Sequence, residues 1–482
     1  MNIFCGQDGD DTRMKNGLLK NQGYKRLQIS ILCILAGAIA IMMCQANRSV
    51  QNVNGRQLST PKSDNGSKNH YSQSSLNSAS HISVPDMEVL YARYQRNLSQ
   101  TQICVLNLPS RKVEVILDTN KMQKRLDNIL GESIFSPDGQ YILFTGWAAG
   151  LPAETRGGYG GINELSDLWV FNRRTKSLRQ LTTDWQGYDS LKWSPDGRYI
   201  SACGLRRWTT PETPPTETGG CYPDLYVWDM RTTRRRLVLN NVNREQWAPD
   251  GGKLFALRND WLLYIWDAQT GKKRLVAEDV KDAFWMPNKG LLFQKHYDDI
   301  LWYSPTVGGD VKPFLPDKEI AALPAVSPDG TKIVYLDNNN DCILTTIASG
   351  KSRLLMKAGG GPYWSPDGRK IVVVTQSAAR GNDPYTTYYN VLDAYSGKSI
   401  TRQAFNDNAD SLGWTQDGRT IIVINRTRKR TIVDGKTVDF VDQPQRLLAV
   451  STETEAVRDM GVLPTTDILQ SPTYWDWRLA VD

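Results

Sequence analysis

The chain has 482 residues, with 58 Lys and Arg against 51 Asp and Glu, and its mean hydropathy is −0.46. This hydropathy excludes a polytopic membrane protein, and the net charge of +7 is too mild for the concentrated basic stripe of a nucleic-acid binder. Of the three histidines, two lie in a polar stretch before residue 86, so a zinc site or catalytic triad built on histidine would depend on His296 alone.

An apolar segment at 27–46 predicts one membrane-spanning helix, because 20 uncharged residues make about 30 Å of helix. Five Lys or Arg residues precede it in segment 1–26 and three follow within 20 residues, which favours a cytoplasmic N-terminus. A cleaved signal peptide and a buried core helix are the alternatives. We expect an uncleaved signal anchor in the cytoplasmic (inner) membrane, with the rest of the chain periplasmic or extracellular.

Residues 47–85 are rich in Ser, Asn and Gln and poor in aromatic and β-branched residues. Such a composition cannot bury enough apolar surface to offset the entropy lost on ordering. We therefore expect a flexible, disordered linker between the anchor and the following domain.

From residue 86 onwards the chain repeats a short turn motif, which begins Phe135-Ser136-Pro137-Asp138-Gly139 and recurs at intervals of 38 to 58 residues. Periods of this size are typical of solenoids and propellers. Asp and Gly at the third and fourth turn positions suit a tight turn with a left-handed exit. The predicted structural turn residues are Asp138, Gly139, Asp196, Gly197, Asp250, Gly251, Asp329, Gly330, Asp367, Gly368, Asp417 and Gly418.

Each turn is followed by short β-branched and aromatic runs, such as DLWVFN and DLYVWD, which predict strands. With the short strand before the turn, each unit becomes a four-stranded antiparallel meander. A Trp precedes five of the seven turns, counting a worn copy at 285–288. One bulky ring per unit at a fixed position is what packing between units requires, so we assign these Trp side chains to the core.

The repeated Trp-Ser-Pro-Asp-Gly turns and the strands ending in Val-Trp-Asp resemble those of TolB-type β-propellers, a WD-like repeat family. The resemblance covers residues 86–482 and implies an all-β propeller. Propeller blades of this kind serve binding scaffolds, lyases and the gating domains of prolyl-oligopeptidase-like enzymes. TolB itself has a folded α/β domain ahead of its propeller, where this chain has the segment 47–85.

Eight blades are expected, with seven as the alternative. Three strands, MEVLYARYQ, TQICVLN and KVEVIL, precede the first turn, and residues 468–472 near the C-terminus resemble an inner strand. Together they would form a composite first and last blade, which closes the ring and removes exposed sheet edges.

No catalytic, metal or cofactor site is predicted. The Gly-x-Ser-x-Gly motif of a hydrolase is absent from the sequence, and Asp337–Asp341 lacks the Gly and the closing Glu of a calcium loop, so we expect a hairpin turn there. Cys104 and Cys342 lie in apolar strands and are predicted to be buried thiols. Cys203 and Cys221 bracket a long loop between adjacent strands, and we predict a disulfide between them in an exported protein.

Four long insertions, 146–166, 204–222, 376–387 and 425–444, are expected to link the second and third strands of units one, two, six and seven. In a closed ring they would form a continuous crescent around the composite blade, opposite the face of the Ser-Pro-Asp-Gly turns. The crescent carries the aromatic and basic side chains typical of binding hot spots: Trp147, Arg156, Tyr159, Arg206, Arg207, Trp208, Tyr385, Arg426, Arg428, Lys429 and Arg430.

The function expected from these features is that of a membrane-anchored, exported scaffold that binds a partner protein or an envelope polymer without catalysis. The alternative is a polysaccharide lyase or another carbohydrate-active enzyme, because propellers often use their central pocket in this way. A lyase needs a converging base, Arg and carboxylate, or a bound divalent metal, and one histidine in the propeller provides little for that chemistry.

Overall fold

The computed structural model describes residues 87–479, apart from internal gaps. The gaps are 96–99, 109, 123–125, 149–165, 185–186, 205–222, 288–289, 297, 299, 306–307, 322–323, 358, 377–385, 407, 427, 434–435, 442–445 and 463–475. The predicted cytoplasmic segment, membrane anchor and linker lie outside these residues. Within them, no helix has the length and apolar composition needed to cross a membrane.

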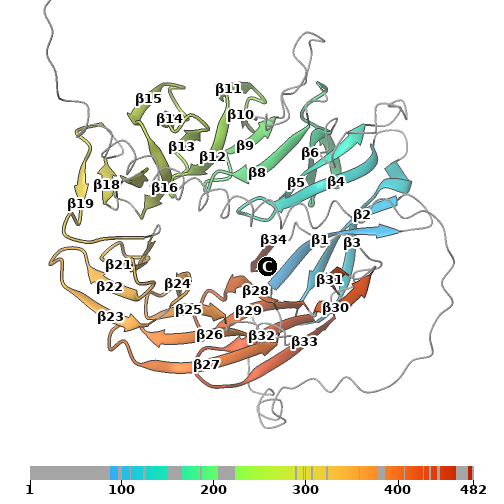
Figure 1. The fold of residues 1–482 in the computed structure, drawn as a ribbon. Helices are drawn as coiled ribbons and strands as arrows, with labels where there is room; N and C mark the ends of the chain where they lie inside the picture. The colour runs from blue at the N-terminus through green and yellow to red at the C-terminus, as the bar shows by residue number, and fades with distance from the viewer. Residues whose placement is uncertain are drawn as a thin grey trace, which may run out of the picture. The chain divides into compact units, whose positions relative to one another are not determined.

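Eight four-stranded antiparallel sheets follow one another along the chain, so the eight-bladed prediction is confirmed and the seven-bladed alternative is wrong (Figure 1). The composite blade consists, from its innermost strand outwards, of β34 (Asp476–Leu479), β1 (Met87–Gln95), β2 (Gln100–Asn107) and β3 (Val113–Asp118). The short 3-10 helix η2 (Thr119–Met122) leads from it to blade 1.

Blades 1 to 4 are meanders of consecutive strands. Blade 1 has β4 (Leu126–Phe135), β5 (Tyr141–Ala148), β6 (Asp167–Asn172) and β7 (Ser177–Gln180). Blade 2 has β8 (Tyr188–Trp193), β9 (Tyr199–Gly204), β10 (Asp224–Asp229) and β11 (Arg235–Leu239). Blade 3 has β12 (Val242–Trp247), β13 (Lys253–Arg258), β14 (Leu263–Asp267) and β15 (Lys273–Ala277). Blade 4 has β16 (Val280–Met286), β17 (Gly290–Lys295), β18 (Leu301–Ser304) and β19 (Lys312–Phe314).

Blades 5 to 7 continue the pattern. Blade 5 has β20 (Ala325–Val326), β21 (Lys332–Leu336), β22 (Cys342–Thr346) and β23 (Ser352–Met356). Blade 6 has β24 (Pro362–Trp364), β25 (Lys370–Gln376), β26 (Thr386–Asp393) and β27 (Ser399–Asn406). Blade 7 has β28 (Asn408–Trp414), β29 (Thr420–Arg426), β32 (Arg446–Ser451) and β33 (Val457–Val462). A separate hairpin, β30 (Arg428–Val433) and β31 (Lys436–Val441), is inserted between its second and third strands.

The composite blade closes the ring, as predicted, but with a different C-terminal strand. β34 pairs with β1 in the register Met87 to Leu479 through Leu90 to Asp476, and Figure 1 shows the two strands side by side. The sequence predicts this inner strand at 468–472, but the strand that pairs with β1 is β34; the segment 468–472 itself lies outside the described residues. Pro472 has no N–H for a strand ladder, whereas Asp476–Leu479 contains no proline.

An apolar cluster fills the interface between each blade and the next, all the way round the ring. At the junction between last and first, buried Tyr91 of the composite blade shares a cluster with Ile422 and Leu447 of blade 7. On the other side of the same blade, the Arg173 guanidinium of blade 1 donates to the two carboxylate oxygens of Glu88 at 2.8 and 2.9 Å. The composite blade is therefore held on both sides.

The Trp residues that precede turns pack against the preceding blade, as predicted, and three of them show how. Trp247 stacks on Tyr199 of blade 2 with ring centroids 5.7 Å apart, and its Nε1 donates to the Ser201 hydroxyl at 3.0 Å. Trp285 and Trp364 donate their indole N–H to a backbone carbonyl of the preceding blade, each at 2.9 Å. Both apolar burial and a directed hydrogen bond therefore fix the spacing between neighbouring blades.

The repeated turns have one internal geometry. In five of them the Ser or Thr hydroxyl donates to the Asp carboxylate at 2.5 to 2.6 Å. The same carboxylate accepts the amide two residues further on, and the Gly adopts a φ of +65° to +68°. The Ser327 hydroxyl and the Thr331 amide lower the pKa of Asp329 to about 2. The turn of blade 5 therefore keeps its charge-assisted hydrogen bonds at any physiological pH.

Neighbouring turns also touch each other on this face of the ring, which we call the turn face. A Cβ placed on Gly251 of blade 3 would lie 2.8 Å from the Asp196 side chain of blade 2. Near the outer edge, arginines of fourth strands reach the next blade. Arg274 donates to Ser304 and Pro305 at 3.3 Å, and Arg353 donates to the Ala394 carbonyl at 2.8 Å. The sequence analysis had not identified this second periodic contact.

Removing residues 476–482 is expected to lower the Tm by roughly 5 °C or more, because β1 loses its partner strand and presents an unpaired inner edge. Removing only 480–482 leaves β34 in place and serves as the control. Differential scanning calorimetry of the two truncations decides the matter. Equal melting transitions would show that β34 does not contribute to ring closure.

Candidate functional site

The four predicted insertions lie where the sequence placed them, between second and third strands of blades 1, 2, 6 and 7. Most of their candidate residues lie outside the described part of the chain: Arg156, Tyr159, Arg206, Arg207, Trp208 and Tyr385. Trp147 is half-buried on β5, Arg426 belongs to β29, and Arg428, Lys429 and Arg430 belong to β30 of the inserted hairpin. The crescent as a binding surface stays a prediction.

The cysteines follow the sequence analysis as far as they are described. Cys104 and Cys342 are fully buried thiols. Cys203 is a buried thiol whose Sγ lies 3.8 Å from the Glu245 carboxylate. Cys221 lies outside the described residues, so the disulfide between Cys203 and Cys221 stays a prediction.

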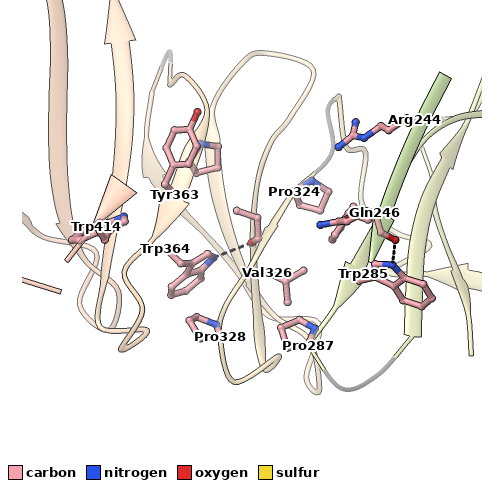
Figure 2. A pocket seen from close by; sticks show the side chains of 13 residues that line it. Arg244, Gln246, Trp285, Pro287, Pro324, Val326, Pro328, Tyr363, Trp364 and Trp414 are labelled. Carbon is pink, nitrogen blue, oxygen red and sulfur yellow. Dashed lines mark hydrogen bonds between the residues drawn. The ribbon is translucent and has the colours of Figure 1, made fainter. Parts of the chain in front are cut away.

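An aromatic groove, which the sequence analysis did not anticipate, runs along the innermost strands of blades 3 to 7. Its volume is about 510 Å³. The lining residues come from β12, β16, β20, β24 and β28 and the segments beside them: Arg244, Gln246, Phe284, Trp285, Pro287, Pro324, Ala325, Val326, Pro328, Pro362, Tyr363, Trp364 and Trp414. Figure 2 shows Pro287 and Pro328 at the end nearer the turn face, with Tyr363 and Arg244 towards the opposite end.

The groove presents rings and prolines with few free polar groups. The indole N–H groups of Trp285 and Trp364 already donate to backbone carbonyls, as the dashed lines in Figure 2 show. Tyr363 is 54% exposed, which is unusual for a large aromatic side chain on an innermost strand. The guanidinium of Arg244 binds the Asp282 carboxylate. The groove therefore suits an apolar, extended ligand with few hydrogen-bond requirements.

A charged cluster lies on the innermost strands of blades 2 and 3. Lys192 on β8 donates to the backbone carbonyl of Glu245 at 2.8 Å and to its carboxylate at 2.5 Å. The register of β8 shifts between Asp189 and Lys192, and Ser190 between them has a φ of +53°. A bulge of this kind redirects the neighbouring side chains. Here Asp189 comes within electrostatic range of both Glu245 and Lys192.

Burial controls the ionisation of this cluster. Asp189 is exposed by its surface area, but the surrounding protein partly desolvates its carboxyl group and raises its pKa to about 6, and the negative charge of Glu245 adds to the effect. Desolvation also raises the pKa of Glu245 and that of the Cys203 thiol. A low-pKa thiolate is the reactive form of cysteine, so this environment disfavours Cys203 as a nucleophile.

The histidine and the acidic residues do not converge on the groove. His296 lies at the end of β17, where its ring contacts Trp261 at a centroid distance of 4.3 Å and its Nδ1 lies 3.4 Å from the Asp279 carbonyl. The Asp337 carboxylate accepts the amides of Asn339 and Asp341 at 2.9 Å, which confirms the predicted hairpin turn. Among the described residues, no group of His, Cys, Asp and Glu side chains is arranged to hold a metal ion.

No protein-family model matches the chain, and no curated protein sequence matches it. Among solved structures, TolB from Acinetobacter baumannii is similar at 14% identity over 64% of this chain and 77% of its own, with a TM-score of 0.31. A prolyl endopeptidase is similar at 17% identity, 71% and 53% coverage and a TM-score of 0.43. An oligogalacturonate lyase from Vibrio parahaemolyticus is similar at 11% identity, 59% and 88% coverage and a TM-score of 0.38.

The strand pairing itself defines the class of protein. Eight four-stranded sheets form a ring that the pairing of β1 with β34 closes, and a groove runs along their innermost strands. The chain is therefore an eight-bladed β-propeller.

Replacing Asp189 by Asn is expected to stabilise the protein at pH 7.5 by about 1 kcal/mol, a figure reduced for the solvent that reaches this side chain. The folded-state pKa of about 6 exceeds the ordinary value of 3.8, so folding favours the protonated acid, and ionisation destabilises the protein as pH rises. The gain should therefore shrink as pH falls from 7.5 towards 4. Denaturant titrations across this range measure it. A loss of stability at pH 7.5 would mean that the ionised carboxylate makes a net favourable contact with Lys192.

Proposed function

We propose that this chain is an exported, membrane-tethered β-propeller that acts as a non-catalytic binding scaffold for a partner protein. The aromatic groove binds an extended, apolar or proline-containing segment of that partner. The observation that carries the proposal is the lining of the groove, where aromatic rings and prolines from five consecutive blades meet. The apolar segment 27–46 supports the membrane tether.

The physical basis of the proposal is the recognition of a preordered extended peptide. Aromatic-lined grooves bind proline-rich segments because the polyproline II conformation loses little entropy on binding. Since two indole N–H groups of the groove are already engaged, affinity comes mainly from ring contacts and desolvation. The Tyr363 end of the groove points away from the turn face, towards the side that carries the predicted crescent.

A carbohydrate-active enzyme is less well supported by the same groove. A lyase needs a free basic group beside the sugar, whereas Arg244 is paired with Asp282 and His296 contacts Trp261 and Asp279. The apolar lining also offers few hydrogen-bond partners to a polyhydroxylated ligand. We therefore favour a protein partner over a polysaccharide.

Replacing Tyr363 by Ala is expected to weaken the binding of proline-containing apolar peptides about tenfold or more, since exposed aromatic side chains in grooves are typical hot spots. The matched control is Tyr395→Ala, because Tyr395 is 88% exposed and lies on a turn after β26, away from the groove. Fluorescence anisotropy with a labelled peptide panel measures both, and neither change should alter the Tm.

Equal binding by the two variants would contradict the groove as the site. If binding is instead lost when 426–440 is shortened to a tight turn, the crescent is the partner surface.

The membrane topology predicts the labelling of two thiols on intact cells. An impermeant maleimide should label a cysteine introduced by Ser74→Cys in the linker and should leave Cys5 unlabelled until the cells are permeabilised. Mass spectrometry of the modified peptides gives the answer. Labelling of Cys5 alone on intact cells would reverse the proposed orientation.

A further inference from the structure

A second cavity lies on the turn face, between blades 2 and 3, far along the ring from most of the aromatic groove. Its volume is about 220 Å³. Three guanidinium groups line it: Arg198 follows the Ser-Pro-Asp-Gly turn of blade 2, and Arg234 and Arg236 belong to the turn and outer strand that follow β10. The buried ring of Trp266 from blade 3 forms part of the apolar wall. We call this cavity the arginine pocket.

The arginine pocket carries an uncompensated positive charge. Arg198 donates to the Asp229 carboxylate at 3.1 Å, and this is the one acidic side chain in the lining. Arg234 and Arg236 are exposed and form no ion pair within the described part of the chain. Hydrogen bonds from the Arg231 amide and Arg198 outweigh desolvation and lower the pKa of Asp229, so it is ionised at neutral pH. Among the lining side chains, three guanidinium groups therefore face one carboxylate, and the Asp196 carboxylate outside the lining lies within electrostatic range of Arg198.

The turn beneath the arginine pocket and the Arg198 side chain are held by contacts within the protein. The carboxylate of Asp229 accepts the Arg231 amide at 2.9 Å, and the Asp229 carbonyl accepts the Thr233 amide at 2.7 Å, which fixes the turn that carries Arg234. The Arg198 guanidinium lies 4.8 Å from the centroid of the Tyr199 ring. The turn backbone and the Arg198 guanidinium are therefore held before any ligand arrives, whereas the exposed side chains of Arg234 and Arg236 become ordered when an anion binds.

The corresponding place in blade 5 lacks this arrangement. There Thr331 stands in the position of Arg198, Lys351 in that of Arg234, and Arg353 in that of Arg236. The Arg353 guanidinium is already engaged with the Ala394 carbonyl of blade 6. In blade 5 the arginine at the position of Arg236 therefore serves the contact with the next blade. Blade 2 adds the guanidinium groups of Arg198 and Arg234, which such a contact does not require.

We propose that the arginine pocket binds a phosphate group. The negative charge of a phosphate monoester complements the excess of guanidinium groups in the lining, and the planar guanidinium fork matches the geometry of phosphate oxygens. The apolar wall at Trp266 strengthens the attraction by excluding water from one side. The group could belong to a phospholipid headgroup or to a soluble phosphate ester, which share this chemistry. The site is independent of the aromatic groove and of its proposed partner.

The test is isothermal titration calorimetry of the full-length chain in nonionic detergent with inorganic phosphate and with glycerol 3-phosphate. The wild type should bind both saturably. The double variant Arg234→Gln with Arg236→Gln should bind roughly a hundredfold more weakly, since each charge-assisted contact contributes about tenfold or more. The matched control is Lys351→Gln with Arg353→Gln, which removes the same two positions from blade 5 and should leave phosphate affinity unchanged.

Absence of saturable binding in the wild type, or an equal loss in the blade 5 control, would overturn the proposal. If the double variant does not fold, Arg234→Gln alone decides the matter, because the Arg234 side chain is exposed and makes no hydrogen bond among the described residues. Displacement of phosphate by phosphatidic acid in mixed micelles, which presents a phosphate monoester, identifies a lipid headgroup as the source, and displacement only by glycerol 3-phosphate identifies a soluble ester. Tyr363→Ala should retain full phosphate binding, which separates this site from the groove.

Discussion

The antiparallel pairing of β1 with β34 is the constraint on which the remaining structure depends. It joins strands from the two ends of the domain into one sheet, and that sheet then buries an apolar cluster against blade 7 on one side and blade 1 on the other. Every blade thereby has two neighbours, and no large apolar blade face is left open to solvent. The groove exists for the same reason, because closure makes the innermost strands of successive blades face a common centre.

The position before the turn contributes both to the packing between blades and to the lining of the groove. The Trp before each turn fills the space between two blades, and in blades 4, 6 and 7 the same residue type also lines the groove. At the same position in blades 2 and 3, Trp193 and Trp247 are buried and do not line the groove, whereas Trp285 of blade 4 is equally buried and forms part of the lining. The groove is therefore lined in part by side chains that already pack between the blades.

The sequence predicted the fold well because its signals are local. The turn motif specifies its own hydrogen bonds, and its period counts the blades, so eight blades and the composite closure followed directly. The closing strand was placed wrongly because four residues at a chain end carry little pattern of their own. The groove could not be predicted, since its lining comes from segments between Arg244 and Trp414 that only the curvature of the ring brings together. The cluster around Glu245 was equally hidden, because its lysine and thiol come from another blade. Arginines do recur at one position in the fourth strands, so their contacts with the next blade could have been predicted from the sequence.

The closure also determines how the propeller would carry mechanical load. β1 is the first described strand, and it runs between β34 and β2, with Glu88 bonded to Arg173 of blade 1. A pull on the chain ahead of Met87 therefore acts along the strand axis and strains the ladders on both sides at once, instead of opening them one bond at a time. Because Met87 pairs with Leu479, the C-terminal strand shares this load at its final residue. A chain segment attached ahead of Met87 would therefore load the composite blade in shear, without separating β1 from β34 one hydrogen bond at a time.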